Sequence, residues 1–524
     1  MRCRATDGPP AGRRRASALP RAGRCWRWAV AALLGALAAL AWNAARAADD
    51  APLRIGSKRF TEAYVLAQVL AQTAAPHART EVLSGLGNTA IVYEALRSGR
   101  IDLYPEYLGT IDQEILKNPQ PSTPDAMARQ LAALGFGVGI PLGFNDGYAL
   151  AMREGDAARL GIRRISDLAA HAGLKFGLSN EFIGRQDGWP GLARAYGLAQ
   201  RPGGIDHGLA YDALARGQID VMDIYTTDAK IGHLGLRVLE DDRAYFPRYD
   251  AVVLYRLDVP QRFPAAWQAL QQLAGSIDER RMIAMNARAE LDGVPFETIA
   301  RDHLAGRDAA AAGGPAPRGF AGKLLGADLA RLTAQHVGLV AASVVLAVLL
   351  GVPLGIAVAS RPVWRAWVLG VTGVFQTVPS LAMLAVLIWA FGRIGTLPAL
   401  AALTLYALLP IVRNTCTGLA GVPAGLKAAA MALGLRRGAV LRHIELPLAL
   451  PTVVAGVRTA TVICVGTATL AAFIGAGGYG ERIVTGLALN DNALMLAGAL
   501  PAALLALACE AAFELLERAV LRRP

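Results

Sequence analysis

The stretch VGLVAASVVLAVLLGVPLGIAVAS, residues 337–360, contains no charged side chain. An α-helix needs about 20 such residues to cross the hydrocarbon core of a bilayer. Four more uncharged apolar runs follow, at Ala366–Phe391, Ile394–Val412, Thr459–Gly480 and Asn492–Cys509. Five such runs argue against buried helices of a water-soluble protein. The sequence therefore predicts an all-α membrane domain of five transmembrane helices within residues 330–524.

The basic residues indicate the orientation of these helices. The net charge is +12, from 53 Lys+Arg against 41 Asp+Glu. If the first predicted helix, residues 337–360, runs inward, ten basic residues fall on the cytoplasmic side, and only Arg393 and Arg482 fall in the external loops. Lys323 and Arg331, just outside this helix, depart from the bias. The ten are Arg361, Arg365, Arg413, Lys427, Arg436, Arg437, Arg442, Arg518, Arg522 and Arg523. Because this is the positive-inside pattern, the charge indicates a cytoplasmic (inner) membrane protein rather than a nucleic-acid binder.

Residues 1–48 are read as a targeting segment. A basic region precedes an uncharged run, Trp28–Ala45, and the small residues that follow are typical of a signal-peptide cleavage site. The run is also long enough for an uncleaved signal anchor. Either alternative places residue 50 outside the cytoplasm.

Residues 50–305 are more polar and predict an extracytoplasmic α/β domain. The stretches ALRSGRIDLY, from Ala95, and ALARGQIDVM, from Ala213, are a weak internal repeat in which a helix ends at glycine and leads into a strand. Two similar lobes favour a hinged, two-lobed α/β domain that binds a ligand between them. An ordinary α/β enzyme is the alternative. No cysteine lies between Ala48 and His336, so the domain is expected to fold without disulfides.

The Ala-, Gly- and Pro-rich residues 306–329 read as a linker. No Ser/His/Asp, paired-carboxylate or metal-ligand spacing is found, so no catalytic residue and no metal are expected. The chain also lacks GxxxxGK[ST], so no ATP site and no cofactor of its own are expected.

A cytoplasmic segment between the third and fourth runs has the composition of a helix pair. Ala428–Leu435 favours a helix that Gly434 ends or bends, and a second helix is expected over Ala439–Ile444, with prolines stopping it at Glu445-Leu446-Pro447. Such a pair is either a docking site for a cytoplasmic partner or an interfacial helix on lipid headgroups.

The spacing of Ala429-Ala430, Gly434 and Ile444-Glu445-Leu446-Pro447 resembles the coupling loop of ABC importer permeases. Over residues 330–516 the resemblance is to the osmoprotectant branch, which imports glycine betaine, choline and related compounds. The stretches that carry it begin FQTVPSLAML at Phe375 and VRTATVICVG at Val457. It implies a separate cytoplasmic ATPase that binds the ATP, and a homodimer or heterodimer of permease domains. Ala428 stands where the family usually has glutamate, which puts the docking in doubt.

Residues 52–305 resemble the substrate-binding proteins of the same systems, which implies an α/β two-lobed periplasmic-binding-protein domain (type II-like). The matching stretches are IGSKRFTEAYVL, GRIDLYPEYLGT, FNDGYALAM, SNEFIGRQDGWPGL, DIYTTDAKI and DDRAYFPRYDAVVL. The resemblance implies a quaternary ammonium ligand. Aromatic faces suit such an ion because it has no N–H to donate and binds them by cation–π contact.

By this resemblance four tyrosines form a cage, with Arg185 pairing a betaine carboxylate and Thr110 donating to it. The four are Tyr107, Tyr148, Tyr225 and Tyr249. Tyr104 is an alternative to Tyr107, because alternate strand residues point in opposite directions. Lys58 and Asp146 are weaker candidates for contacts between the lobes, and Trp189 is expected to shape the pocket. A membrane-tethered sensor and an anchored enzyme remain alternatives, and the particular amine stays open.

Overall fold

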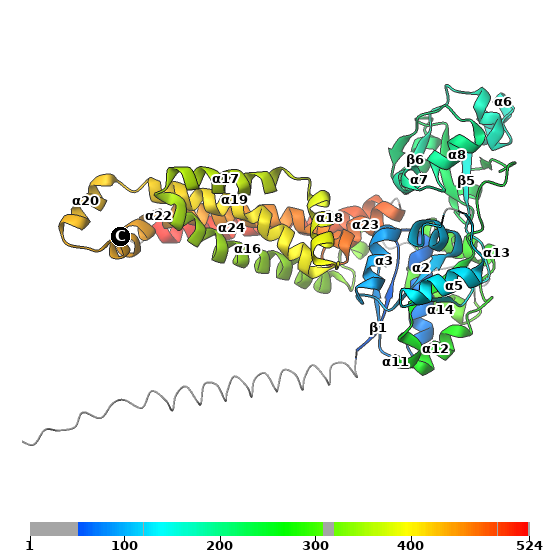
Figure 1. Ribbon diagram of the computed structural model, residues 1–524, viewed down its shortest axis with the longest axis horizontal. Helices are drawn as coiled ribbons and strands as arrows, with labels where there is room; N and C mark the ends of the chain where they lie inside the picture. Colours follow the sequence, from blue (N-terminus) through cyan, green and yellow to red (C-terminus); the bar gives the residue numbers. More distant parts are fainter. Residues whose placement is uncertain (1–50, 119, 308–318, 490, 522–524) are drawn as a thin grey trace, which may run out of the picture. The chain divides into compact units, whose positions relative to one another are not determined.

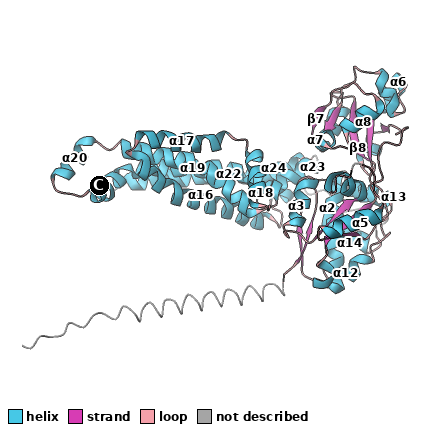
Figure 2. Cartoon of the chain, viewed as in Figure 1, coloured by secondary structure: helices cyan, strands magenta, loops and turns pink. Residues whose placement is uncertain are grey.

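The computed structural model describes residues 51–118, 120–307, 319–489 and 491–521. The predicted signal segment and residues 308–318 of the predicted linker lie outside the described residues. Figure 1 follows the chain by colour. Figure 2 shows that the strands belong to the N-terminal part, whereas the part from residue 319 onward is drawn as helices.

The first lobe is built on a five-stranded sheet with the order β2-β1-β3-β10-β4. β1 runs parallel to β2 and β3, whereas β10 runs antiparallel to β3 and β4. The strands are β1 (Leu53–Gly56), β2 (Thr80–Leu83), β3 (Leu103–Tyr107), β4 (Phe136–Gly139) and β10 (Ala251–Arg256). The main helices are α2 (Thr61–Ala74), α3 (Thr89–Arg97), α5 (Pro124–Ala133), α12 (Pro264–Gln271), α13 (Glu279–Glu290) and α14 (Phe296–Leu304).

The second lobe repeats this order. Its sheet β8-β5-β9 is joined to the pair β6-β7 by a parallel bridge between Phe176 and Val221, which gives β7-β6-β8-β5-β9. β5 is antiparallel to both β8 and β9, as β10 is to β3 and β4. The strands are β5 (Tyr148–Arg153), β6 (Gly177–Ser179), β7 (Gly203–Ile205), β8 (Val221–Tyr225) and β9 (Leu236–Val238). The main helices are α6 (Glu154–Leu160), α7 (Asn180–Gly184), α8 (Trp189–Tyr196) and α9 (His207–Ala215).

The internal repeat found in the sequence is confirmed as a structural unit. Helices α3 and α9 are each followed by a glycine, Gly99 or Gly217, with φ +69° in both cases. Each glycine leads into a strand that begins four residues later, β3 at Leu103 and β8 at Val221. The carboxylate of the intervening aspartate, Asp102 or Asp220, accepts a backbone N–H of the neighbouring segment at 2.8 Å.

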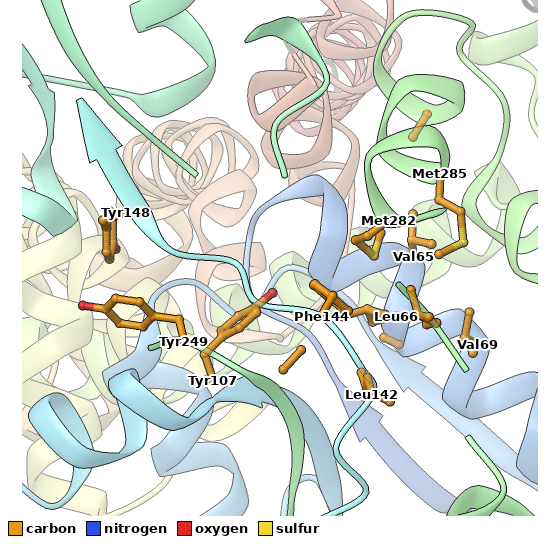
Figure 3. Close-up of a cluster of buried hydrophobic side chains, with 14 of the residues drawn as sticks. Val65, Leu66, Val69, Tyr107, Leu142, Phe144, Tyr148, Tyr249, Met282 and Met285 are labelled. Atoms are coloured by element: carbon orange, nitrogen blue, oxygen red, sulfur yellow. The ribbon is translucent and has the colours of Figure 1, made fainter. Parts of the chain in front are cut away.

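The core of the first lobe continues to the boundary between the lobes. Figure 3 shows side chains of α2, such as Val65 and Leu66, packed against methionines of α13, with Tyr107 and Tyr249 at the other end of the cluster. The chain crosses between the lobes in residues 140–147 and 239–250. Burial of this apolar surface stabilises the frame at about 25 cal/mol per Å² and brings tyrosines to the crossing points.

The membrane part contains four described helices that are long and apolar enough to cross a bilayer. A fifth span results if α17 and α18, bent by 103°, count as one broken span. The helices are α16 (Leu329–Ala359), α17 (Pro362–Thr377), α18 (Ser380–Phe391), α19 (Thr396–Ala420), α22 (Leu446–Thr467), α23 (Gly480–Leu489) and α24 (Asn492–Leu521).

Two predicted helices differ from the structure. The run Ala366–Phe391 is not one straight helix, because Val378 is extended (ψ 128°) before Pro379, which has no N–H to donate. The helix expected from Thr459 begins earlier, at Leu446. The prediction that prolines stop the preceding helix at Glu445-Leu446-Pro447 is therefore wrong. Pro447 lies in the first turn, where the absent N–H costs nothing.

The basic residues that departed from the charge bias have acidic partners. Lys323 forms an ion pair with Asp491, and Arg331 pairs with Glu481 at 2.8 Å. By contrast, Arg436, Arg437 and Arg442 form no salt bridge within the described part of the chain. Local neutralisation therefore accounts for the departure.

Candidate functional site

Two of the four predicted cage tyrosines, Tyr107 and Tyr225, lie at equivalent places of the two lobes. Tyr107 ends β3 and Tyr225 ends β8, whereas Tyr148 opens β5 and Tyr249 lies in the second crossing. The ring centroid of Tyr148 is 5.1 Å from that of Tyr225 and 5.6 Å from that of Tyr249. Three of these rings therefore make one cluster, and Figure 3 shows Tyr107 beside it.

Phe60 connects Tyr107 to the other lobe. Its ring centroid lies 5.4 Å from that of Tyr225, in a stacked arrangement, and 6.2 Å from that of Tyr107. Phe60 precedes α2 in extended conformation and is half-buried. The sequence reasoning did not select it, although it stands in a loop rather than at helical core spacing, which was the signal used for the tyrosines.

Tyr104, the alternative to Tyr107, points away from this cluster. It is fully buried on the opposite face of β3, in a separate hydrophobic core of the first lobe. Trp189 packs on Phe176, with ring centroids 5.2 Å apart, and so belongs to the core of the second lobe.

A cavity of about 110 Å³ opens between the lobes beside Phe60 and Tyr225, and the other three cage tyrosines do not line it. The carboxylates in its lining are Glu181 and Asp206, and the basic side chains are Lys58, Arg59 and His207. The faces of the two rings suit a cation with an apolar shell, because the π-faces are negative and need no hydrogen-bond donor.

Arg185 lies over the tyrosines but already has a partner. Its guanidinium carbon is 5.3 Å from the ring centroid of Tyr148 and 6.0 Å from that of Tyr249. Its Nε and Nη2 donate to the two carboxylate oxygens of Asp187 at 2.8 and 2.5 Å, and Nη1 faces Thr110 Oγ1 at 3.4 Å. Both members of the pair are buried. The structure thus brings Arg185 and Thr110 together, as predicted.

Asp187 is a residue that sequence reasoning missed. It also accepts the hydroxyl of Tyr249 at 2.6 Å, so it positions one ring and one guanidinium. Its position two residues after Arg185 was the available signal. Because a bidentate carboxylate balances the guanidinium, the cage has no large unpaired positive charge from this arginine.

Lys58 has a role within one lobe. Its Nζ is 2.5 Å from Glu106 Oε1, and both side chains are buried in the first lobe. The ammonium is 5.4 Å from the ring centroid of Tyr107, which it supports from beside the cage. The structure therefore shows Lys58 in a contact within the first lobe, whereas the sequence predicts a contact between the lobes.

Asp146 does take part in contacts between the lobes. It accepts from the Thr227 hydroxyl at 2.8 Å, and that hydroxyl also contacts Glu62 at 2.6 Å. Burial raises the pKa of Glu62 to about 7, against the opposing hydrogen bonds from Thr227 and Tyr107. Burial likewise raises the pKa of Asp146 well above its ordinary range.

His207 is a charged neighbour of the cage. Burial disfavours its charge, but Asp228 at 2.9 Å outweighs that effect and raises the pKa of His207 to about 9. The imidazolium lies 4.8 Å from Tyr225, ring centroid to ring centroid. A fixed cation therefore lies beside the ring of Tyr225.

The predicted coupling residues form a folded loop that leads into α22. Helix α20 (Ala424–Ala432) contains Ala428, Ala429 and Ala430, and the chain turns at Gly434, where φ is +84°. Helix α21 (Arg437–Val440) follows. A π-helical turn, Leu441–Glu445, then runs into α22 and carries the rest of the motif.

One ion pair closes this loop, and apolar side chains cover its outside. Lys427 Nζ lies 3.1 Å from Glu445 Oε1 and donates to the Leu419 carbonyl at 3.0 Å. Leu426, Met431 and Leu433 are exposed, Leu433 by 81%. Exposed leucines beside unpaired arginines are typical of a surface that another protein covers. The motif residues Ile444, Glu445 and Leu446 are half-buried beneath it.

Comparisons with known protein families divide the chain into two matched segments. Residues 51–306 match the substrate-binding domain of the ABC-type glycine betaine transport system. Residues 351–522 match the binding-protein-dependent transport system inner membrane component.

Characterised relatives match either part. The choline transport system permease protein OpuBD of Bacillus subtilis is 44% identical over 187 residues, which are 36% of this chain and 82% of that protein. The osmoprotectant import permease protein OsmW of Salmonella typhimurium is 45% identical over 184 residues, 34% of this chain and 85% of its own length. The ergothioneine transport permease/ergothioneine binding protein EgtU of Helicobacter pylori is 32% identical over 279 residues, 51% of this chain and 50% of EgtU.

Proposed function

The chain belongs to the binding-protein-dependent inner-membrane permeases of ABC importers, and we propose that it captures a quaternary ammonium compound and conducts it inward. The permease domain spans the cytoplasmic membrane several times, and the binding domain lies outside the cytoplasm. Both components of an importer are therefore fused on one polypeptide. A separate soluble receptor is not needed to deliver substrate to this permease domain.

The observation that carries the ligand class is the convergence of aromatic rings from both lobes. Phe60 and Tyr107 come from the first lobe, Tyr148 and Tyr225 from the second, and Tyr249 from a crossing. A trimethylammonium group suits such rings because each desolvated cation–π contact contributes about 2 kcal/mol. Choline and glycine betaine share this group, and relatives are named as their transporters.

The carboxylate end of a betaine has a candidate partner in the Nη1 edge of Arg185 and the Thr110 hydroxyl. The remaining guanidinium edge belongs to Asp187. Replacing Arg185 by Ala is therefore expected to weaken the binding of glycine betaine about tenfold, which is the contribution of one charge-assisted hydrogen bond. The binding of choline, which has no carboxylate, should be unchanged. Equal losses for the two ligands in calorimetry would contradict this split.

The partner proposed for the cytoplasmic side is an ABC ATPase that docks on the α20–α21 loop. The chain has no GxxxxGK[ST] motif of its own, so ATP is bound by the partner and no cofactor is held here. Two permease domains, identical or different, would form the pathway. Gly434→Trp is expected to stop transport and leave substrate binding intact, because a tryptophan is strained at φ +84°. Loss of both activities would count against the docking role.

The test of the ligand class is calorimetry on the full chain in lipid nanodiscs with choline, glycine betaine, carnitine and proline. We expect the three trimethylammonium compounds to bind more tightly than proline, which carries no trimethylammonium group. Absence of binding by all three would overturn the proposal. Transport of bound ligand into vesicles that also contain the ATPase would then separate an importer from a sensor.

A further inference from the structure

A buried chain of hydrogen bonds joins the two lobes beside the cage. Thr227, two residues after Tyr225, places its Oγ1 2.6 Å from Glu62 Oε2 and 2.8 Å from Asp146 Oδ1. The other oxygen of Glu62 is 2.5 Å from the Tyr107 hydroxyl. Glu62 opens α2 in the first lobe, and Asp146 lies in the first crossing. We call Tyr107, Glu62, Thr227 and Asp146 the interlobe clasp.

The clasp has three short oxygen–oxygen contacts but two hydroxyl hydrogens. Tyr107 and Thr227 each supply one hydrogen, whereas an ionised carboxylate supplies none. If Tyr107 donates to Glu62, Thr227 has a single hydrogen for two carboxylates. The third contact, at 2.6 or 2.8 Å, then needs a hydrogen that belongs to a carboxyl group.

The surroundings of the clasp also favour a bound proton. Glu62 and Asp146 are 2% and 4% exposed, and neither forms a salt bridge within the described residues. Two of the nearby cations are paired with other acids, since His207 pairs with Asp228 and Lys58 pairs with Glu106, whereas Lys230 lies over the ring of Tyr211 rather than on either clasp carboxylate. The titratable groups that face the clasp are Lys58, Glu106, Tyr107, His207, Asp228, Lys230 and Glu290.

We propose that closure of the two lobes over the substrate takes up one proton, which Glu62 and Asp146 share in the interlobe clasp. The inference rests on the proposed function, since it assigns a proton to the closed, substrate-bound form of the same site. It makes capture of a permanently charged cation dependent on external pH, although the cation itself does not titrate. Glu62 and Asp146 act as positioning residues, because Glu62 holds the Tyr107 hydroxyl and Asp146 holds Thr227.

The direction of the pH dependence follows from the closed form. With the lobes joined through Thr227, burial raises the pKa of Glu62 to about 7, against an ordinary value of 4.5. Above pH 7 the Glu62 carboxyl of the closed form is ionised, so protonation adds nothing to the affinity for choline. As the pH falls from 7 toward 4.5, the closed form is protonated before the open form, so affinity rises. We expect on the order of a tenfold gain in choline affinity between about pH 8 and about pH 5.5.

The experiment is titration calorimetry of the full chain in nanodiscs with choline, in two buffers of different ionisation enthalpy. Choline has no group that titrates in this range, so protons taken up belong to the protein. We expect up to about one proton per choline bound near pH 6.5. Glu62→Gln and Asp146→Asn should bind choline as tightly as the wild type does at low pH, without proton uptake, because an amide N–H supplies the third hydrogen.

Glu290→Gln is the matched control, since Glu290 is a half-buried acid beside the clasp that forms no hydrogen bond to its four residues within the described part of the chain. The control should keep the wild-type dependence of choline affinity on pH. A pH dependence that vanishes in Glu290→Gln but survives in Glu62→Gln would overturn the clasp, as would pH-independent choline binding in the wild type.

Infrared spectroscopy separates failure of the clasp from failure of the proposed function. If neither choline nor glycine betaine binds at any pH, the ligand class is wrong, and the clasp is then decided on the chain bound to whichever other compound it takes, by the carboxylic-acid C=O band gained on binding. A band at about pH 6 that Glu62→Gln or Asp146→Asn removes supports the shared proton. A wild-type spectrum without that band would overturn it.

Discussion

The two lobes of the binding domain share one backbone unit but support it with different polar groups. In each lobe a helix is followed by a left-handed glycine and then by a strand. The strand ends on a tyrosine eight residues after the glycine, at Tyr107 or Tyr225. In the first lobe a buried ion pair, Lys58–Glu106, lies against the tyrosine strand. In the second, Ser179 donates its N–H and hydroxyl to Asp223 at 2.6 Å each. The unit places the cage, whereas the supports set the charge around it.

The largest difference between the lobes should appear when these supports are removed. Lys58→Met leaves Glu106 buried without a cation, which should lower the free energy of unfolding of the first lobe by about 3–5 kcal/mol. Ser179→Ala removes one hydroxyl and leaves the N–H bond to Asp223, so about 1–2 kcal/mol is expected. Hydrogen exchange of the full chain, read on β3 and β8 by mass spectrometry, measures both. Equal losses of protection would show that the two supports are energetically equivalent.

The cage tyrosines test whether the lobes contribute equally to binding. Tyr225→Ala should weaken choline and glycine betaine alike by about 2 kcal/mol, roughly 30-fold, because one cation–π face is lost. Tyr107→Ala is the matched change in the first lobe. Tyr225→Phe keeps the face and should lose little. Calorimetry decides: an Ala variant without effect in either lobe would remove that ring from the cage.

The repeated unit was predictable because it depends on local sequence. Gly99 and Gly217 mark the helix ends, and Ile-Asp pairs mark the approach to β3 and β8. Uncharged runs likewise predicted the membrane helices, although one of them is broken before Pro379. Local signals of this kind require no knowledge of distant contacts.

The polar partners of the cage were less predictable. Glu62 reads in the sequence as an acidic residue in the first turn of a helix, which is a sufficient local explanation. Its contact with Thr227 joins residues 165 positions apart. Asp187 and Phe60 lay within matched motifs but had no pattern of their own. Which side chains meet across a cleft depends on the pairing of the lobes, which periodicity does not contain.

The smallest effect, and the closest test of equivalence, concerns the two glycines. Gly99 and Gly217 share φ +69°, and each has an arginine nitrogen near the position of a would-be Cβ, Arg256 at 3.5 Å and Arg153 at 3.9 Å. Those distances are ordinary contacts, so the cost of alanine is backbone strain alone. A left-handed alanine costs about 1–2 kcal/mol, and the two substitutions should therefore destabilise their lobes equally.

Hydrogen exchange of Gly99→Ala and Gly217→Ala measures this pair of values in the full chain. Equal losses of protection at α3 with β3 and at α9 with β8 would mean that the unit has the same energetics in both places. The lobes would then differ only through side chains such as Lys58 and Ser179. A loss confined to one lobe would show instead that packing around the repeat, rather than its backbone, distinguishes the halves that close on the substrate.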